Sequence, residues 1–309
     1  MVCALGPTPA TRIPLGASGL EVAPLAWGMW RLADASAASP RARVEAALEI
    51  GCTLFDTADV YGYHQGSGFG EAERILGTVF REAPALREQM VLATKAGIAP
   101  PTPYNSSAQY LIEACEASLT RLKVERIDLL QIHRPDLLAH PAEVAQAFER
   151  LRQAGKIRAA GVSNYSAAQF EALRQHLPFE LASVQNEFSA LAIEPLTDAT
   201  LDTAMRRGVA VLAWSPLAQG RLAARAGEST GDARTDAVVA ALDAVALRAG
   251  TVRSAVAYAW IMAHPARPIP LIGSQNLARI REARSAYAVH MTREEWYRIL
   301  VAARRARMP

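Results

Sequence analysis

Three ionisable side chains each close a short apolar segment in the first half of the chain. Asp56 ends the segment TLFD, Lys95 ends VLATK and His133 ends LLQIH. Tyr61 follows a few residues after Asp56. If the three segments are neighbouring parallel strands, these side chains meet at one rim, because barrel enzymes carry their chemistry at the C-terminal ends of the strands. The sequence therefore predicts one cluster of titratable groups.

Such a cluster can donate a proton to a carbonyl group. A tyrosine has an ordinary pKa of about 10, and a neighbouring ammonium lowers such a pKa by roughly 1 to 3. Lys95 would supply the ammonium, and Asp56 would hold it charged and aimed. His133 would orient and polarise the carbonyl, so that Tyr61 acts as the acid. The hydride must come from a nicotinamide cofactor, because no side chain supplies one.

Each of these residues also has an ordinary structural explanation when it is taken alone. Asp56 suits a helix cap or a turn, and Lys95 suits a solvated loop. His133 suits a core strand, and Tyr61 suits a loop that covers the core. Their joint placement at consecutive strand ends favours catalysis, because unrelated structural roles rarely converge in this way. Only three of the 33 basic residues are lysines, which also indicates a special role for Lys95.

The elements that must position this cluster alternate between strand and helix. Short apolar or β-branched segments predict strands at 25–28, 53–56, 91–95, 129–133, 159–163, 183–187, 209–214 and 269–273. Apolar residues at three- and four-residue steps predict helices at 41–50, 70–81, 107–121, 142–154, 166–175, 196–207, 251–263 and 276–287. This α/β alternation predicts a closed (β/α)₈ TIM barrel that occupies residues 1–309 as a single domain. A doubly wound sheet is disfavoured, because no G-x-G-x-x-G follows the first strand.

Four segments fall outside the eight repeating units. Alternating apolar residues around a turn at 16–19 predict an N-terminal β-hairpin that would plug the bottom of the barrel. Residues 220–231 and 232–249 would add a loop and a helix over the barrel mouth. An extra C-terminal helix is expected over 293–305.

Composition and charge narrow the classes of function. The chain has 309 residues, of which 51% are hydrophobic and 20% charged, as is typical of a globular protein. A net charge of +3 predicts no nucleic-acid partner and no membrane surface. No apolar run is long enough to span a bilayer or is typical of a signal peptide, so we expect a cytoplasmic protein. Cys3, Cys52 and Cys115 lack the spacing of a disulfide or zinc site, and no metal is expected.

Longer motifs resemble one known family. They run in order along nearly the whole chain as LGASGLEVAPLAWGMWRL, FDTADVYG, ATKAG, IDLLQIHRPD, GKIRAAGVSN, VQNEFS, AWSPLAQGRL and IPLIGSQNLARIREA. Their content and order resemble the aldo-keto reductase superfamily of NAD(P)H-dependent barrel enzymes, and within it the bacterial oxidoreductases more than the mammalian aldose reductases. The resemblance implies reduction of aldehydes or ketones, with Tyr61 as general acid/base. Asp56, Lys95 and His133 would complete a catalytic tetrad.

The resemblance also assigns residues to the cofactor. Ser163, Asn164 and Gln185 would hold the nicotinamide carboxamide, and Trp214 would stack on the nicotinamide ring. The loop after Trp214 would bind the pyrophosphate through backbone N–H groups. Arg279 would bind an adenosine 2′-phosphate, which predicts that NADP(H) is preferred over NAD(H). The expected cofactor-binding residues are Gly28, Met29, Trp30, Asp56, Ser163, Asn164, Gln185, Trp214, Ser215, Pro216, Leu217, Ala218, Gly220, Arg221, Gly273, Ser274, Gln275, Arg279 and Glu282.

Two positions depart from the family's pattern. Ala283 stands where relatives often carry Asn, and Gly273 stands where many carry Lys. One hydrogen bond to adenine is therefore in question, and we expect weaker cofactor binding than in the relatives that bind most tightly.

Other classes of function compete with carbonyl reduction. Metal-dependent hydrolysis would need several His and carboxylate ligands, but the six His are scattered and no His-x-His occurs. Glu187 after Asn186 resembles the arrangement in retaining glycosidases, but these need a second carboxylate about 5 Å away and the later strand ends offer none. A regulatory or redox-sensing barrel that binds the cofactor with little turnover is the more serious alternative. The complete set of four titratable residues favours catalysis.

The substrate is expected to be a small-molecule carbonyl compound whose identity depends on the loops. Loops at the barrel mouth determine specificity in such folds, here 62–69, 97–105, 187–195 and 221–249. Four aromatic residues favour an apolar or aromatic aldehyde, namely Trp30, Tyr63, Tyr104 and Phe188. A monomer or weak oligomer is expected from the resemblance.

Overall fold

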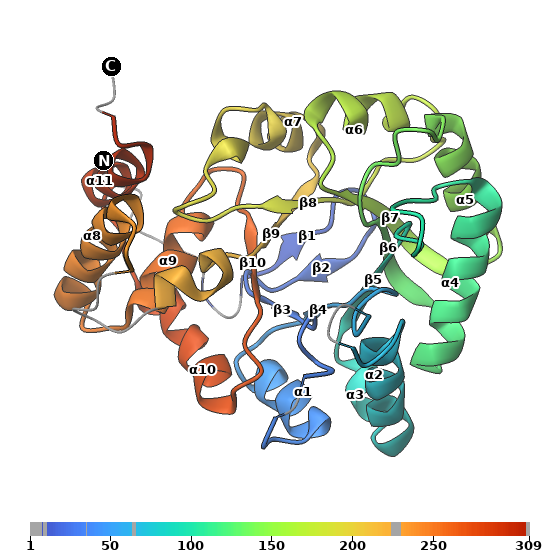
Figure 1. The fold of residues 1–309 in the computed structure, drawn as a ribbon, viewed down its shortest axis with the longest axis horizontal. Helices are drawn as coiled ribbons and strands as arrows, with labels where there is room; N and C mark the ends of the chain where they lie inside the picture. Colours follow the sequence, from blue (N-terminus) through green and yellow to red (C-terminus); the bar gives the residue numbers. More distant parts are fainter. Residues whose placement is uncertain (1–7, 9–10, 35, 64–65, 224–229, 307–309) are drawn as a thin grey trace.

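Eight parallel strands close into a barrel (Figure 1). The computed structural model describes residues 8, 11–34, 36–63, 66–223 and 230–306. In ring order the strands are β10 (Ile269–Ile272), β3 (Ala26–Gly28), β4 (Leu54–Asp56), β5 (Val91–Ala96), β6 (Ile127–Ile132), β7 (Ile157–Ser163), β8 (Ser183–Glu187) and β9 (Ala210–Trp214), and β9 pairs with β10. Each predicted strand matches one of these, so the predicted (β/α)₈ TIM barrel is confirmed.

Helices surround the barrel (Figure 1). They are α1 (Pro40–Glu49), α2 (Glu71–Glu82), α3 (Ala85–Glu88), α4 (Ala108–Leu122), α5 (Pro141–Gln153), α6 (Ala167–Arg174), α7 (Thr200–Arg207), α8 (Ala233–Ala249), α9 (Arg253–Met262), α10 (Leu277–Glu282) and α11 (Arg293–Arg304). Three short 3-10 helices are η1 (Glu194–Leu196), η2 (Ala218–Ala223) and η3 (Ala283–Ala288). The helix predicted over 276–287 divides into α10 and η3, and the one predicted over 196–207 begins only at Thr200.

Side-chain caps fix where several of these helices begin. Ser166 and Thr292 each accept a hydrogen bond from the backbone of the third helical residue, whose side chain bonds back to the cap. Both are capping boxes. Because Ser166 caps α6 so soon after β7 ends at Ser163, Asn164 lies in a short connection at the barrel rim.

The N-terminal hairpin closes one end of the barrel. Its strands β1 (Ile13–Pro14) and β2 (Glu21–Val22) are antiparallel, and they lie within the ring of barrel strands in Figure 1. Buried residues of this hairpin form one apolar cluster with inward residues of the barrel: Ile13, Leu15, Leu20, Val22, Leu54, Leu129, Leu212 and Ile269. Several of these barrel residues stand near the N-terminal ends of their strands. The predicted plug at the bottom of the barrel is confirmed.

Helix α8 forms part of the wall at the barrel mouth, where the sequence predicted an inserted helix. Asp232 begins it by accepting hydrogen bonds from the backbone N–H groups of Arg234 and Thr235. The Arg248 guanidinium then joins α8 to Glu295 on α11, at 2.5 and 3.0 Å. The predicted helices 232–249 and 293–305 are confirmed, whereas part of the predicted loop, residues 224–229, lies outside the described residues.

Apolar side chains fill both the barrel interior and the layer between strands and helices. Cys52 and Cys115 lie buried in the outer layer as free thiols, and Cys3 lies outside the described residues. Among the helices that the structure describes, none combines the length and apolar character needed to cross a bilayer. The single domain, the cytoplasmic location and the oligomeric state stay predictions.

Candidate active site

Lys95 stands at the centre of a buried polar cluster. Its Nζ atom lies 2.5 Å from Asp56 Oδ2, and it also donates to the Thr57 carbonyl at 2.9 Å and to Tyr61 Oη at 3.2 Å. The Lys95 and Asp56 side chains are only 1% and 2% exposed. The two residues belong to β5 and β4, which pair in parallel. The structure therefore brings together three of the four residues of the expected tetrad.

His133 adds the fourth group. It directly follows β6, and its ring meets the Tyr61 ring edge to face, with centroids 5.7 Å apart. Its backbone is fixed on both sides, since its N–H donates to the Ala96 carbonyl at 2.8 Å and its carbonyl accepts from Asn164 Nδ2 at 2.9 Å. Tyr61 and His133 both line the cavity described below. The imidazole is thus beside the phenol, at a position from which it can contact a carbonyl.

Burial and charge set the protonation of Tyr61 and Lys95. Burial raises the pKa of Tyr61, and although Lys95 lowers it, the net pKa is above the usual value. The expectation of a net lowered tyrosine pKa is therefore wrong. Burial lowers the pKa of Lys95, but Asp56 and Tyr61 outweigh this effect and leave it raised. Tyr61 is therefore a protonated phenol beside a Lys95 side chain that stays positively charged. This charge stabilises the phenolate that forms when Tyr61 gives up its proton.

Two buried amides complete the hydrogen bonds to Asp56. Its Oδ1 atom accepts from Gln131 Nε2 at 3.1 Å and from Gln185 Nε2 at 3.0 Å. Gln185 is one of the expected cofactor residues, whereas Gln131 was missed by the sequence analysis. The available signal was a polar amide in the middle of the apolar strand β6, two residues before His133.

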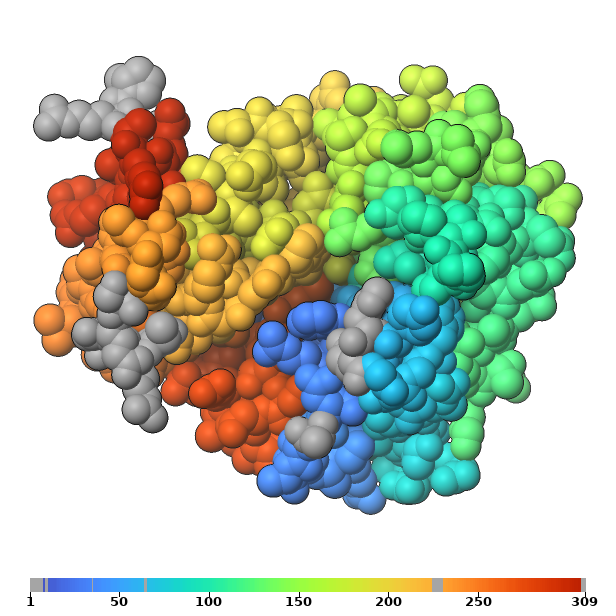
Figure 2. All heavy atoms as spheres, in the orientation of Figure 1, coloured from blue at the N-terminus to red at the C-terminus, as the bar shows by residue number. Residues whose placement is uncertain are grey.

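A cavity of about 1910 Å³ opens beside this cluster. In Figure 2 the surface is hollowed between the blue N-terminal and the orange C-terminal segments. It is lined by Asp56, Tyr61 and His133 and by most of the expected cofactor residues: Gly28, Met29, Trp30, Ser163, Asn164, Gln185, Trp214, Ser215, Pro216, Leu217, Gly220, Gly273, Ser274, Gln275, Arg279 and Glu282. Lys95 lies behind Asp56 and Tyr61 and does not reach the wall.

Two expected cofactor residues are not brought to this wall. Ala218 is fully buried in the apolar core, and the Arg221 side chain is exposed, with its Nε atom donating to the Ala218 carbonyl at 3.2 Å. Between these two residues the backbone is left-handed at Gln219 and Gly220 rather than helical, and the neighbouring Leu217 and Gly220 line the cavity instead.

Neutral polar groups lie at the end of the cavity where the nicotinamide is expected to bind. Ser163 Oγ donates to the Gln185 carbonyl at 2.8 Å, and Asn164 Nδ2 donates to Ser163 Oγ at 3.0 Å. Trp214 Nε1 donates to Asn164 Oδ1 at 3.1 Å, which fixes the indole at the wall. Asn164 itself has a φ of 60°, a left-handed conformation that Asn tolerates better than most residues. These contacts pre-arrange donors and acceptors suited to a carboxamide.

In the loop after β9, several residues adopt the left-handed backbone conformation. Ser215, Gln219 and Gly220 have φ values of 50°, 60° and 98°, and all three line the cavity. Backbone turns of this kind expose successive N–H groups and form concavities that bind anions. The loop therefore suits a pyrophosphate between the two ends of the cavity.

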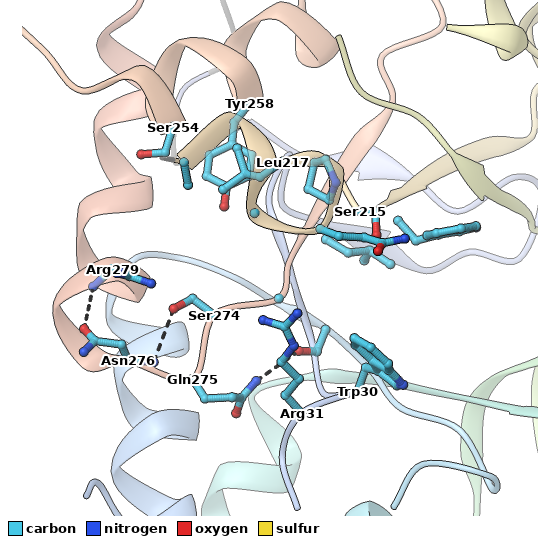
Figure 3. A pocket seen from close by; sticks show the side chains of 18 of the residues that line it. Trp30, Arg31, Ser215, Leu217, Ser254, Tyr258, Ser274, Gln275, Asn276 and Arg279 are labelled. Atoms are coloured by element: carbon cyan, nitrogen blue, oxygen red, sulfur yellow. Dashed lines mark hydrogen bonds between the residues drawn. The ribbon is translucent and has the colours of Figure 1, made fainter. Parts of the chain in front are cut away.

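The far end of the cavity presents a cation. Figure 3 shows Arg279 near Asn276 and Ser274, with Ser254 and Tyr258 contributed by α9. The Arg279 backbone N–H donates to Asn276 Oδ1 at 3.1 Å, and among the described residues its guanidinium has no acidic partner. Its neighbour Arg281, by contrast, pairs with Glu49 at 2.8 Å. Arg279 is thus available to an anion from outside the chain.

The aromatic residues expected around the substrate are mostly elsewhere. Trp30 lines the cavity, and the Arg31 guanidinium lies 5.2 Å from the centre of its ring. Phe188 is buried in the core, and its ring packs 5.6 Å from that of Trp260. Tyr63 and Tyr104 are not among the cavity-lining residues. The expectation of an aromatic pocket therefore holds for Trp30 alone among these four. Arg134, which directly follows His133, lines the cavity and was missed.

The residues present fit a phosphorylated nicotinamide dinucleotide. Neutral donors and acceptors stand at one end of the cavity, a loop of left-handed residues at its middle and an available guanidinium at its far end. These match a carboxamide, a pyrophosphate and a ribose phosphate in turn. When bound, such a cofactor supplies a hydride.

Comparison with known proteins identifies the family. The model of the Aldo/keto reductase family matches residues 24–302. The 6-dehydroglucose reductase of Novosphingobium aromaticivorans is 50% identical over 98% of this chain and 99% of its own length. Oxidoreductase YdhF of Escherichia coli is 39% identical over 94% of this chain and 97% of its own length, and the 6-dehydroglucose reductase of Agrobacterium fabrum is 36% identical over 92% and 95%. The chain belongs to the aldo/keto reductase family of oxidoreductases.

Proposed function

We propose that this protein reduces aldehydes or ketones to alcohols with NADPH, and that Tyr61 is the general acid. One observation carries the proposal: Lys95 Nζ contacts both Asp56 Oδ2 and Tyr61 Oη, while Asp56 and Tyr61 line a cavity of about 1910 Å³. The family match supports the reaction class. A cavity with convergent titratable groups is the expected form of an active site.

Tyr61 donates the proton of the reaction. Reduction of the carbonyl group places negative charge on its oxygen, and the phenolic proton of Tyr61 would move to that oxygen to give the alcohol; a bound nicotinamide cofactor would supply the hydride. Lys95 stabilises the phenolate that remains, because its Nζ atom already lies 3.2 Å from Tyr61 Oη. A proton from solvent then restores the phenol. His133 orients the carbonyl from its place beside the Tyr61 ring.

We assign the preference for NADP(H) over NAD(H) to Arg279. Its guanidinium lines the far end of the cavity and has no acidic partner among the residues that the structure describes. A ribose 2′-phosphate would supply that partner, and a guanidinium binds phosphate oxygens in a bidentate manner. NAD(H) lacks this phosphate and gains nothing from the contact.

The substrate class proposed first is a sugar aldehyde. Two relatives, one of them 50% identical, are named 6-dehydroglucose reductase. Arg134, which directly follows His133, and Trp30 both line the cavity, and they offer hydrogen-bond donors and an aromatic face. Such a wall suits a compound with many hydroxyl groups better than an aromatic aldehyde.

The test is loss of reduced-nicotinamide absorbance with NADPH and a panel of carbonyl compounds that begins with 6-dehydroglucose. We expect many turnovers by the wild-type protein, and a loss of roughly 10²- to 10⁴-fold in kcat for Tyr61→Phe, which keeps the ring and removes the proton. Tyr110→Phe is the matched control, because the Tyr110 hydroxyl donates to the Ile98 carbonyl at 3.2 Å and Tyr110 is not a cavity-lining residue.

The possible outcomes separate the competing functions. Multiple turnovers that disappear in Tyr61→Phe and persist in Tyr110→Phe support the proposal. Oxidation of a single equivalent of bound NADPH, followed by a stall with every carbonyl compound, would instead support the regulatory barrel and overturn the proposal. Undiminished turnover by Tyr61→Phe would overturn the role of Tyr61 alone.

A further inference from the structure

Four residues stand in register across four neighbouring strands of the barrel. Lys95 on β5 pairs with Gln131 on β6, Gln131 with Gly161 on β7, and Gly161 with Ser183 on β8. The Gln131 and Ser183 side chains are fully buried. Burial of a polar group costs folding free energy unless the group is hydrogen-bonded. The hydrogen-bond partners of these two side chains therefore indicate their structural role.

Gly161 allows Gln131 and Ser183 to meet across the strand between them. A Cβ atom at position 161 would lie 2.1 Å from Ser183 Oγ and 3.2 Å from Gln131 Cγ. Because glycine leaves that space open, Ser183 Oγ donates to Gln131 Oε1 at 3.2 Å. The side chains of Gln131 and Ser183 thus connect β6 to β8 across β7.

Asp56 and Ser183 together hold the Gln131 amide. An ionised carboxylate only accepts, so Gln131 presents Nε2 to Asp56 Oδ1 at 3.1 Å, and its oxygen is left to accept from the Ser183 hydroxyl. The opposite orientation would place Oε1 against the carboxylate. Ser183 is therefore a second contact that keeps the amide in place against Asp56.

The two amides on Asp56 differ in what else they can contact. Gln185 lines the cavity and is an expected partner of the nicotinamide carboxamide, whereas Gln131 does not reach the cavity wall. If Gln185 turns toward a bound cofactor, Gln131 is the amide donor that stays on Asp56 Oδ1. Without that donor the carboxylate would be held on one side by Lys95 alone, and its position against Lys95 would be less well fixed.

We infer that Gln131, held in place by Ser183, is a positioning residue that keeps the Asp56 carboxylate aimed at Lys95. The inference rests on the proposed function, because the benefit is a charged Lys95 beside Tyr61. The ionisable groups around Asp56 are Lys95 from β5 and Tyr61 from the loop after β4. The charges of Asp59 and Tyr61 also act on this cluster, and His133 faces the Tyr61 ring.

The main test replaces Gln131 with a side chain of the same length that has no donor. For Gln131→Met we expect kcat to fall about tenfold, which is the usual scale for a lost hydrogen bond to a charged group. We also expect KM to change little, because Gln131 does not line the cavity. Carboxyl-carbon NMR at one fixed pH should show the Asp56 signal moved from its wild-type position, and this readout needs no turnover.

A double-mutant cycle tests the part played by Ser183. Ser183→Ala should change kcat and the Asp56 NMR signal in the same direction as Gln131→Met, but less. Added to Gln131→Met, it should have no further effect, because Ser183 acts through the amide that is already gone. Ser118→Ala is the control: Ser118 is also fully buried and accepts from Arg121 Nη2 at 3.0 Å, but it lies on α4. It should lower the melting temperature and leave kcat and the Asp56 signal unchanged.

Each failure has its own signature. If Gln131→Met lowers the melting temperature but leaves kcat and the Asp56 signal at their wild-type values, Gln131 is only a packing residue and the inference is overturned. Equal effects of Ser183→Ala with and without Gln131 would overturn the role of Ser183. Absence of turnover in the wild type would count against the proposed function, while a moved Asp56 signal in Gln131→Met would still support the positioning role.

Discussion

Lys95 contacts Tyr61 in two ways, since its Nζ atom lies 3.2 Å from the phenolic oxygen and 5.0 Å from the centre of the ring. The cation is therefore held against both the hydroxyl and the π-face of the tyrosine. Its interaction with a phenolate is stronger than with a phenol, so it stabilises the state that follows proton transfer more than the state that precedes it. Interactions of this differential kind are the ones that accelerate a reaction.

Removal of this charge should abolish most of the activity. Lys95→Met alone would leave Asp56 as a buried, unpaired carboxylate, which typically costs about 3 to 5 kcal/mol of stability. The informative variant is therefore Lys95→Met combined with Asp56→Asn, which removes both charges and nearly conserves volume. We expect it to fold, to bind NADPH and to lose roughly 10²- to 10⁴-fold in kcat.

Lys156→Met is the matched control for this double variant. Lys156 is partly exposed and pairs with Glu116, far from the cavity wall. Its kcat should equal that of the wild type. Wild-type kcat in the double variant would contradict the role assigned to Lys95.

The pH dependence of reduction should reflect the raised pKa of Tyr61. An acid must be protonated to act, so activity is present below its pKa and is lost as the pH rises through it. Because burial leaves the pKa of Tyr61 above its usual value, we expect this loss above about pH 10. The measurement is kcat/KM for a slow aldehyde as a function of pH, with protein stability followed in parallel. A midpoint well below 10 in a folded enzyme would contradict the prediction.

Arg279→Ala should distinguish the two cofactors. Loss of the guanidinium should raise the Kd of NADPH about tenfold, on the usual scale of a charge-assisted hydrogen bond, and leave that of NADH unchanged. Fluorescence titration gives both constants. Arg281→Ala is the control, because Arg281 is close in sequence but pairs with Glu49 and does not line the cavity. Equal losses for NADPH and NADH would show that Arg279 does not recognise the 2′-phosphate.

Gly77→Ala should destabilise the fold without touching the site. Gly77 lies on α2 where that helix meets the C-terminal end of α4, and an added Cβ would lie 2.2 Å from the Arg121 carbonyl oxygen. Backbone atoms cannot move aside as a flexible side chain can, so we expect a cost of about 3 kcal/mol, at the upper end for overpacking. Urea unfolding measures it. Thr78→Ala, at the next position and less buried, should be close to neutral.

The barrel could be predicted because its repeating pattern of strand and helix is visible in short stretches of the sequence. Each strand is a short apolar run, and each following segment has helical spacing, so that the order of elements needed no knowledge of tertiary contacts. Asp56, Lys95 and His133 could be predicted for a related reason: parallel pairing aligns the ends of β4, β5 and β6, and polar residues at those ends necessarily become neighbours. The scarcity of lysine added weight to Lys95, whereas Lys156 forms only a partly exposed ion pair.

The remaining features depend on three-dimensional burial, which local patterns do not encode. Gln131 could not be singled out, because its role arises from contact with residues on β4 and β8. The net pKa of Tyr61 required knowing that burial outweighs the Lys95 charge. Likewise Phe188 follows a strand end, yet it packs against Trp260 in the core. The late start of α7 comes from Ala199, whose φ of 67° interrupts the helical backbone.

The hairpin that plugs the barrel also limits the path by which molecules can enter and leave the site. With β1 and β2 closing the bottom, a molecule that reaches Tyr61 from the cavity leaves through the same mouth by which it entered. On the proposed function, the residues that would hold the cofactor and those that would contact the carbonyl compound line the same cavity. The two molecules would therefore share one opening, so that each would restrict the path of the other, and an ordered kinetic mechanism is expected.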